Sequence, residues 1–377
     1  MEIKTFKVEQ WMDAYENDAV YNLAETCIDS LTVGELLDLA GIDRKSFWDS
    51  VCDTRLTYSN IYGSPALLRG IASLYQALPP DHAVPMHGAI AANNIAYKAL
   101  VKPGCSTVTA LPTYQQHSSI PEALGADVRV LQLRKENGYL PDLNELRALV
   151  DDTTAVISLN NPNNPTGALI SPDLLREIAD IAASVDAYVL VDEVYRGITP
   201  DGSYAPSIID FYEKGVSVGS MSKVFSLAGL RLGWVATRDT ALIDAIKEHR
   251  DYDTISCPVL DDLLAAIALT NKDAILARNR GIVLRNREIL CDWVARTQGV
   301  SFVPPAAGTT ALLEFDLDMD SYDFCKELLD ATGVFLTPGG AFDLTGCTAR
   351  IGYAFDSREL RTGLDRLAAF LTTKLPR

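Results

Sequence analysis

Short apolar runs alternate with amphipathic stretches through the middle of the chain. Runs typical of buried strands occur at residues 107–111, 128–131, 154–159, 188–191 and 216–219, each separated from the next by a helical pattern or a loop. This alternation predicts an α/β fold with a mostly parallel central sheet and helices on both faces. The pairs Ser64-Pro65 and Ser171-Pro172 predict helix starts, because serine caps a helix and proline suits its first turn.

The pattern changes after residue 241. It is helical to about residue 297, and strand-like runs at residues 310–315 and 349–353 precede a helical tail that begins at Ser357. We expect a smaller α+β domain there. The predicted division is a large domain of residues 50–265, which would bind the ligand, and a small domain of residues 1–49 and 266–377. Residues 1–49, which carry Trp11 and Tyr15, form an amphipathic N-terminal arm that could dock on either domain or on a second subunit.

Composition narrows the classes of partner. Of the 377 residues 48% are hydrophobic and 22% are charged, which is typical of a folded globular protein. The net charge of −17 repels nucleic acid and anionic lipid, so neither is an expected partner. The longest apolar stretch, residues 263–269, is too short to cross a bilayer.

The cysteines and histidines predict neither disulfides nor a metal site. Seven cysteines are scattered without a CxxC pair, and four histidines lack HxxxH spacing. The first ten residues have no apolar core of the kind found in signal peptides. We therefore expect a cytoplasmic protein.

Four polar loops carry residue types that suit one kind of chemistry. They are the NPNNPTG stretch at residues 161–167, the DEVY stretch at residues 192–195, the SMSK stretch at residues 220–223 with GLRLG at 229–233, and RIGY at residues 350–353. Each alone is ordinary: a turn, a capping acid, a solvated lysine or a salt bridge. Three of them follow predicted strands, and ligands of open α/β sheets bind beyond the carboxyl ends of the strands, so we expect the loops to converge.

These motifs resemble the fold-type I pyridoxal 5′-phosphate (PLP) enzymes, specifically the class I/II aminotransferases, over nearly the whole chain. Within that family Trp11 and the stretches at residues 31–36 and 250–256 are similar to capreomycidine synthase. The resemblance implies the fold-type I architecture, PLP as the cofactor, and an amino acid and a 2-oxo acid as substrates. It also implies a homodimer with shared active sites.

The resemblance implies roles for three catalytic residues. Lys223 matches the lysine that forms a Schiff base with the cofactor and then serves as general base. Asp192 matches the carboxylate that keeps the pyridine nitrogen protonated. Tyr195 and Asn164 match the two donors to the 3′-oxygen, and a cis peptide bond at Asn164–Pro165 would orient the asparagine.

The remaining implied roles concern binding. The phosphate would be held by the helix start at Gly88, Ala89 and Ile90, by Ser220, Ser222 and Arg231, and by Tyr58 of a neighbouring subunit. Tyr114 would stack on the cofactor ring. Arg350, helped by Asn164, would bind the α-carboxylate of the substrate. No residue is expected to bind a metal.

The sequence says little about the substrate side chain. Residues 8–43, which are expected to wall the pocket, contain no Lys or Arg but do contain Glu16, Glu25 and Asp29. This favours a neutral or cationic side chain. Arg250 is the opposing candidate, because some aspartate-specific relatives supply a cation to the partner subunit from this stretch.

Three functions follow from these motifs. The first is an aminotransferase that interconverts an L-amino acid and a 2-oxo acid by a ping-pong mechanism. The alternatives of the same chemistry are a C–S lyase or a capreomycidine-synthase-like cyclase. A non-catalytic PLP-binding sensor is more remote, because such sensors usually carry a DNA-binding domain and the residues ahead of Trp11 leave no room for one.

Overall fold

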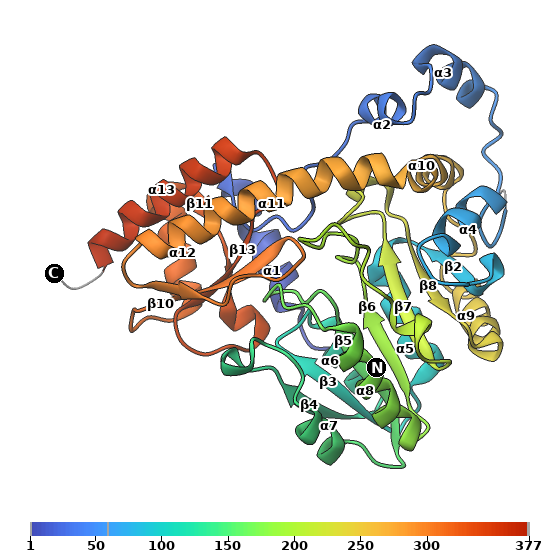
Figure 1. Cartoon of the computed structure of the whole chain (residues 1–377), viewed down its shortest axis with the longest axis horizontal. Helices are drawn as coiled ribbons and strands as arrows, with labels where there is room; N and C mark the ends of the chain where they lie inside the picture. Colours follow the sequence, from blue (N-terminus) through green and yellow to red (C-terminus); the bar gives the residue numbers. More distant parts are fainter. Residues whose placement is uncertain (1, 59, 375–377) are drawn as a thin grey trace.

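A seven-stranded sheet is the centre of the larger part of the molecule (Figure 1). The computed structural model describes residues 2–58 and 60–374. The strand order is β2-β8-β7-β6-β5-β3-β4, and the pairs from β7 through β4 are all parallel, whereas β8 runs antiparallel to both β7 and β2. The strands are β2 (Ala83–Met86), β3 (Ser106–Leu111), β4 (Asp127–Gln132), β5 (Thr154–Asn160), β6 (Tyr188–Asp192), β7 (Gly215–Ser220) and β8 (Gly233–Thr237).

All five strands predicted for this sheet are confirmed, whereas β2 and β8 were not predicted. β2 has four residues and contains Pro85, which a strand tolerates at the edge of a sheet, where β2 lies. β8 begins at Gly233, the last residue of the glycine-rich GLRLG stretch, whose pattern is typical of a loop. The hydrophobic pattern of the sequence therefore did not distinguish the short edge strand β2 or the antiparallel strand β8 from loops.

Helices cover both faces of this sheet, as predicted. Successive side chains of a strand point to opposite faces, so Val189 and Val191 belong to one core cluster and Leu190 to another. Because both faces are buried, apolar side chains follow one another in a central strand such as β6 instead of alternating with polar ones. The helices of this part are α4 (Pro65–Ala72), α5 (Gly88–Leu100), α6 (Gln116–Ala123), α7 (Leu143–Leu149), α8 (Pro172–Ser184), α9 (Thr240–Asp251) and α10 (Val259–Thr270).

A smaller sheet with helices on it forms the second part. The order β12-β13-β10-β9 is antiparallel, and β1 pairs with β11 separately. The predicted strands near residues 310–315 and 349–353 and the helix from Ser357 are confirmed. The elements are β9 (Val300–Phe302), β10 (Thr310–Phe315), β11 (Val334–Phe335), β12 (Thr337–Pro338), β13 (Thr348–Gly352), α11 (Lys272–Arg296), α12 (Ser321–Thr332) and α13 (Ser357–Lys374).

The predicted helix caps are present at two helices. The hydroxyl of Ser64 accepts the N–H of Leu67 at the start of α4, and Ser171 accepts the N–H of Leu174 at the start of α8. Short 3-10 helices complete the chain, namely η1 (Glu16–Asp18), η2 (Pro80–His82), η3 (Lys135–Asn137), η4 (Ile208–Asp210), η5 (Ala228–Leu230) and η6 (Gly339–Phe342).

The N-terminal segment docks on the smaller part. α1 (Lys7–Tyr15) buries Trp11, whose indole N–H donates to the carbonyl of Leu336 and whose ring stacks on Phe335 at 6.0 Å. β1 (Tyr21–Asn22) then pairs with β11. α2 (Val33–Leu39) and α3 (Arg44–Cys52) project from the body of the molecule (Figure 1). The domain boundaries at residues 50 and 265 stay a prediction.

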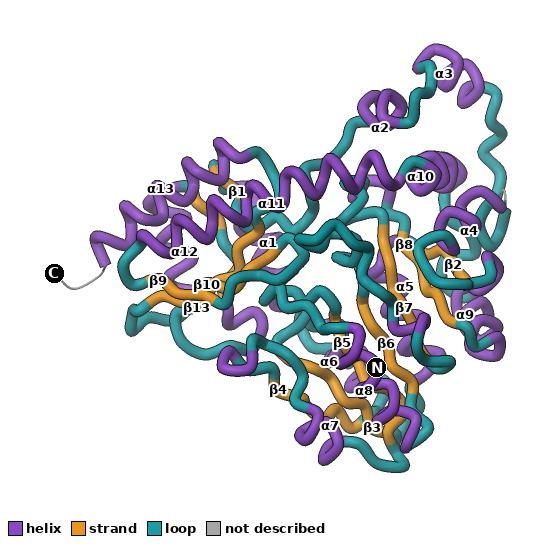
Figure 2. The backbone as a smooth tube through the Cα atoms, in the orientation of Figure 1, coloured by secondary structure: helices purple, strands orange, loops and turns teal. Residues whose placement is uncertain are grey.

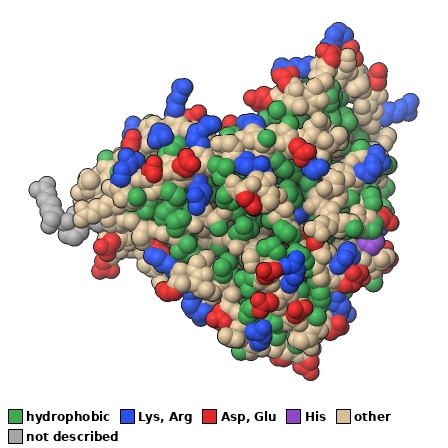
Figure 3. Space-filling model, in the orientation of Figure 1, with side chains coloured by type: hydrophobic (Ala, Val, Ile, Leu, Met, Phe, Trp, Pro, Cys, Tyr) green, Lys and Arg blue, Asp and Glu red, His purple; other side chains and the backbone are tan. Residues whose placement is uncertain are grey.

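Loops lie between the two sheets, and the long helix α11 runs from the larger part to the smaller one (Figure 2). On the face drawn in Figure 3, acidic and basic side chains are interspersed around a hydrophobic central region. Within residues 2–58 and 60–374 there is no helix with the length and apolar character to cross a membrane.

We expect Trp11→Ala to lower the free energy of unfolding by about 3–5 kcal/mol, since it removes a buried ring and leaves the Leu336 carbonyl without its partner. The matched control is Trp48→Ala, because Trp48 is 50% exposed and should change stability by only about 0.5 kcal/mol. Urea unfolding followed by circular dichroism measures both. Equal midpoints for the two variants would show that the arm is not anchored through Trp11.

Candidate active site

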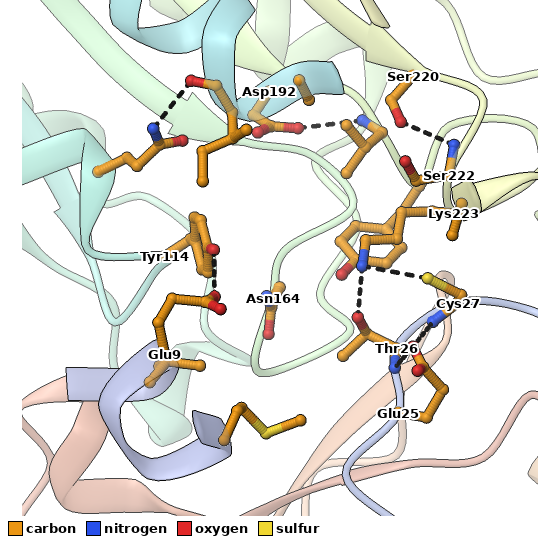
Figure 4. Close-up of a pocket in the computed structure, with 18 of the residues that line it drawn as sticks. Glu9, Glu25, Thr26, Cys27, Tyr114, Asn164, Asp192, Ser220, Ser222 and Lys223 are labelled. Atoms are coloured by element: carbon orange, nitrogen blue, oxygen red, sulfur yellow. Dashed lines mark hydrogen bonds between the residues drawn. The ribbon is translucent and has the colours of Figure 1, made fainter. Parts of the chain in front are cut away.

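One cavity of about 380 Å³ collects the predicted loops (Figure 4). Its wall combines the carboxyl ends of β5, β6 and β7, the start of α5, the N-terminal segment and β13. The predicted residues on this wall are Ala89, Ile90, Tyr114, Asn164, Asp192, Tyr195, Ser220, Ser222, Lys223, Arg231 and Arg350. The expected convergence of the loops is therefore observed.

Two predicted residues lie off this wall. Gly88 is buried directly behind Arg231, because a Cβ on Gly88 would lie 2.8 Å from the Arg231 Nη2 atom. Tyr58 is 67% exposed and does not line the cavity of its own chain. Its predicted role concerns a neighbouring subunit and stays a prediction.

Asp192 ends β6 as a buried carboxylate with neutral partners. Its Oδ2 accepts a hydrogen bond from Asn93 Nδ2 at 2.9 Å, and its Oδ1 accepts the N–H of Val194 at 3.1 Å. Among the described residues no Lys or Arg lies within 4.0 Å of it. A buried carboxylate is costly without a positive partner, so this position suits a cationic ligand group.

Asn93 and His117 are site residues that the sequence reasoning missed. Asn93 lies one turn into α5, and His117 Nε2 is 3.7 Å from Asp192 Oδ2. Nδ1 of His117 lies 2.9 Å from the Tyr97 hydroxyl and 3.1 Å from the Ser158 hydroxyl, so a buried polar chain supports the carboxylate from behind. Without metal-ligand spacing, His117 carried no signal in the sequence.

Lys223 follows β7 and extends into the cavity toward the N-terminal segment. Its Nζ donates to Thr26 Oγ1 at 2.7 Å and contacts Cys27 Sγ at 3.5 Å (Figure 4). Burial by itself would lower the pKa of this ammonium group, but the acidic groups of Cys27, Tyr195 and Glu25 around it raise the pKa. Without a ligand, Lys223 is therefore held in its charged form.

Arg350 reaches the cavity from β13 and meets Asn164. Its Nη1 donates to Asn164 Oδ1 at 3.2 Å, and its Nη2 donates to the Ala24 carbonyl and to Thr337 Oγ1. The Nε–H has no partner, and no described carboxylate lies within 4.0 Å of this guanidinium. A buried guanidinium without a counter-ion suits an anionic ligand group.

The loop that carries Asn164 is held by Asn160. The Asn160 side chain accepts the N–H of Asn164 at 2.6 Å and donates to the carbonyl of Asp192 at 2.8 Å. It thereby links the ends of β5 and β6. The peptide bond between Asn164 and Pro165 is cis, as the sequence suggested.

Another part of the cavity wall is formed by the start of α5, Ser220, Ser222 and Arg231. Ser220 Oγ accepts the N–H of Ser222 at 2.8 Å, and Arg231, in the left-handed conformation with φ 47°, donates to the Ala228 carbonyl. A Cβ on Gly233 would lie only 2.5 Å from the N atom of Ala89, so glycine allows β8 to approach the helix start. Helix N–H groups, hydroxyls and a guanidinium together suit a phosphate.

Two tyrosines border the middle of the cavity. Tyr114 donates its hydroxyl to Glu9 and packs against Phe6 with the ring centroids 4.6 Å apart. Tyr195 is buried, and this burial raises the pKa of its hydroxyl, while Lys223 lowers it. Both hydroxyls are therefore neutral donors at physiological pH.

The acidic N-terminal segment does wall the cavity. Glu16 and Glu25 line it, whereas Asp29 pairs with Arg278 at 3.2 Å. Arg250 is fully buried elsewhere and does not line this cavity. The wall also includes residues that the sequence reasoning did not single out, namely Glu9, Asp13, Thr26 and Cys27.

The residues present fit PLP. Among the described residues Asp192 lacks a Lys or Arg partner, which a protonated pyridine nitrogen would supply, and the group around Arg231 suits the phosphate. Lys223 lines the same cavity. No described group of three or more His, Cys, Asp or Glu side chains could hold a metal ion.

Comparison with known proteins agrees with this geometry. Residues 30–367 match the family model "Aminotransferase class I and II". The chain belongs to the class I and II aminotransferase family. The family match confirms the predicted cofactor, PLP, and the predicted enzyme class.

Individual relatives cover most of the chain. It is 30% identical over 375 residues to capreomycidine synthase of Streptomyces vinaceus, and the alignment covers 97% of this chain and 93% of that protein. It is 29% identical to an LL-diaminopimelate aminotransferase of Dehalococcoides mccartyi, with 83% of each chain covered. The crystal structure of a PLP-dependent aminotransferase from Streptococcus suis is similar, with a TM-score of 0.96, 40% identity and all of both chains covered. The predicted fold-type I architecture is confirmed.

We expect Gly233→Ala to weaken PLP binding by about tenfold or more, because the added methyl group pushes the start of α5 away from Arg231. Gly229→Ala in the same motif is the control, since a Cβ there meets no atom within 4 Å. Titration of the apoenzyme with PLP, followed by absorbance, measures the affinity. Equal affinities for the two variants would contradict the close approach.

Proposed function

We propose that this protein is a cytoplasmic homodimer that transfers the amino group of an L-amino acid to a 2-oxo acid with PLP. The observation that carries the proposal is that Asp192, Lys223, Arg231 and Arg350 line one cavity. Each of the four would bind a different group of the cofactor or the substrate. Asp192 is buried with no Lys or Arg within 4.0 Å among the described residues, and Arg350 is buried with no carboxylate within that distance. Arg231 lies beside Ser222 at the start of α5. A cofactor with a basic nitrogen and a phosphate, together with a carboxylate substrate, would satisfy all of them.

The cofactor, when bound, supplies an electron-accepting ring that stabilises negative charge at the substrate Cα. Asp192 would hold the ring nitrogen in its protonated form, and Asn93 and His117 would hold Asp192 in position. Ser220, Ser222 and Arg231 would bind the phosphate. These contacts fix the plane of the ring relative to Lys223.

Lys223 moves the proton in this proposal. Lys223 would hold the cofactor and, when released from it as the neutral amine, its Nζ near Thr26 could take the proton from the substrate Cα. Tyr195 and the Nδ2 group of Asn164 would donate to the cofactor 3′-oxygen, since Oδ1 of Asn164 is used by Arg350.

Arg350 orients the substrate. Its planar guanidinium suits a forked contact with the α-carboxylate, and its bonds to Ala24 and Thr337 fix its plane. A fixed carboxylate keeps the Cα–H bond directed at Lys223. This orientation favours proton removal over loss of the carboxylate.

A second subunit would complete the site. The exposed apolar side chains Leu56, Tyr58, Ile61 and Tyr62 lie close together in sequence, and such a cluster is typical of an interface. Tyr58 from one subunit would reach the phosphate bound in the other.

Cyclisation is the second candidate. Capreomycidine synthase matches almost the entire chain, whereas the diaminopimelate aminotransferase matches a smaller share. Removal of the Cα proton is common to amino-group transfer, to elimination and to cyclisation. The product formed from the amino acid therefore distinguishes transfer, elimination and cyclisation. All three products can be measured in one reaction mixture.

We expect Lys223→Ala to abolish the covalent link to PLP and to lower the rate of amino-group transfer at least about a hundredfold. Borohydride reduction followed by peptide mass analysis should place the cofactor on residue 223 of the wild-type protein. Lys102→Ala is the control, because Lys102 is exposed and lies away from the cavity. A fixed cofactor on any other lysine would remove Lys223 from this role.

The same wild-type protein is then mixed with amino acids without a co-substrate. Conversion of the bound cofactor to the pyridoxamine form with one equivalent of 2-oxo acid supports transfer. Pyruvate and ammonia in large excess over the enzyme indicate elimination. A cyclic amino acid found by mass spectrometry indicates cyclisation.

We expect mixing of two impaired variants to restore activity if Tyr58 acts across the interface. Tyr58→Ala and Lys223→Ala proteins would form hybrid dimers in which one site keeps both residues, so about a quarter of wild-type activity should return at equal concentrations. The control is Tyr252→Ala in place of Tyr58→Ala, since Tyr252 is also exposed. A mixture with only the summed activities of its parents would contradict a shared site.

A further inference from the structure

The charges on the cavity wall do not balance once the cofactor is accounted for. Its cations are Lys223, Arg231 and Arg350, and each has a task in the proposed function. Asp192 is matched by the ring nitrogen. Four more carboxylates line the wall, and among the described residues none of them forms an ion pair within 4.0 Å, namely Glu9, Asp13, Glu16 and Glu25.

Three of these carboxylates form a stripe on the N-terminal segment. Glu9, Asp13 and Glu16 are spaced at i, i+4 and i+7 across α1 and η1, so they share one face, while Val8 and Trp11 are buried. Glu9 accepts the Tyr114 hydroxyl and Glu16 accepts Asn22 Nδ2, both neutral donors. Among the described residues none of the three has a cationic side chain within 4.0 Å.

Glu25 lies on the other side of the cavity from Glu9 (Figure 4). Its Oε1 accepts the N–H groups of Thr26 and Cys27, both at 2.7 Å, which fixes the carboxylate on its loop. Burial by itself would raise the pKa of Glu25, but Lys223 and these N–H groups lower it, so the group is ionised. Lys223 and Arg350 are cations that interact electrostatically with Glu25, and both have a task in the proposed function.

Arg350 independently indicates a ligand in the same cavity. Its side chain is 3% exposed, lines the wall, and has an Nε–H without a partner and no carboxylate within 4.0 Å. Arg350 therefore requires an anion, whereas the carboxylates of the stripe and of Glu25, on opposite sides of the cavity, favour a cation between them. A molecule that satisfies both carries an α-carboxylate and a distant positive charge.

We propose that the amino-acid substrate has a cationic side chain, an ammonium or guanidinium group, which Glu25 and the Glu9-Asp13-Glu16 stripe bind. The inference rests on the proposed function, because Arg350 must take the α-carboxylate. Attraction across a partly buried cavity favours such a side chain over a neutral one of equal size. It also disfavours aspartate and glutamate, whose side chains would meet like charges.

The test compares L-arginine with L-citrulline, which has nearly the same shape without the charge, and L-lysine with L-norleucine. Apparent Kd values come from the change in cofactor absorbance of the holoenzyme, and 2-oxo acid is measured in the same samples. We expect the cationic member of each pair to bind at least about tenfold more tightly, and this preference to fall as salt is added. Equal affinities within both pairs would overturn the inference.

Two variants assign the preference to these residues. Glu25→Gln should weaken arginine binding about tenfold more than it weakens citrulline binding, because only arginine loses a charged partner. The ratio of the two affinities removes any effect that the change has through Lys223. Asp13→Asn, at an exposed position where folding is not at risk, should weaken arginine binding by about twofold to fivefold. Asp18→Asn is the matched control, since Asp18 is exposed on η1 and does not line the cavity. If each variant weakens the binding of arginine and of citrulline by the same factor, the assignment of the preference to these residues is overturned.

Failure of this inference is distinguishable from failure of the proposed function. A preference for cationic amino acids in binding, without any 2-oxo acid, would contradict amino-group transfer and support the inference. Amino-group transfer from neutral or acidic amino acids without that preference would support the proposed function and overturn the inference.

Discussion

The buried carboxylate of Asp192 at the end of a central strand is the constraint on which the site depends. A carboxylate in this position is destabilising unless something positive and hydrogen-bonded meets it. Asn93 and the N–H of Val194 hydrogen-bond to it, and His117 Nε2 lies 3.7 Å from its Oδ2. Among the described residues this carboxylate has no Lys or Arg within 4.0 Å, and the cofactor would supply a cation.

Elsewhere in the cavity a buried positive charge, the guanidinium of Arg350, has no carboxylate within 4.0 Å among the described residues. Arg350 is carried by the smaller sheet, yet it reaches Asn164 on the loop after β5 and leaves its Nε–H unsatisfied. Lys223 meets Thr26 and Cys27, which belong to the N-terminal segment. Groups from both sheets and from the arm therefore share one cavity, and ligand binding stabilises their mutual arrangement.

The arm connects stability with specificity. Trp11 anchors α1 on the smaller part, and the opposite face of the same helix turns Glu9 and Asp13 toward the cavity. Because a helix presents residues three and four apart on one face, a single anchoring side chain fixes the direction of several charges. The segment that shapes the substrate end is thus not part of the sheet that holds the cofactor residues.

The sequence by itself determined the parallel sheet, most of the strand positions and most of the residues that line the cavity. Apolar runs such as 188–191 report burial directly, and the loops after them follow from the direction of parallel strands. It did not reveal β2, β8, Asn93 or His117, nor which acidic residues of the arm line the cavity. Glu16 and Asp29 look alike in the chain, yet one lines the cavity and the other pairs with Arg278. Only the tertiary structure decided this, because the placement of a side chain relative to residues hundreds of positions away depends on packing between elements, which leaves no local pattern.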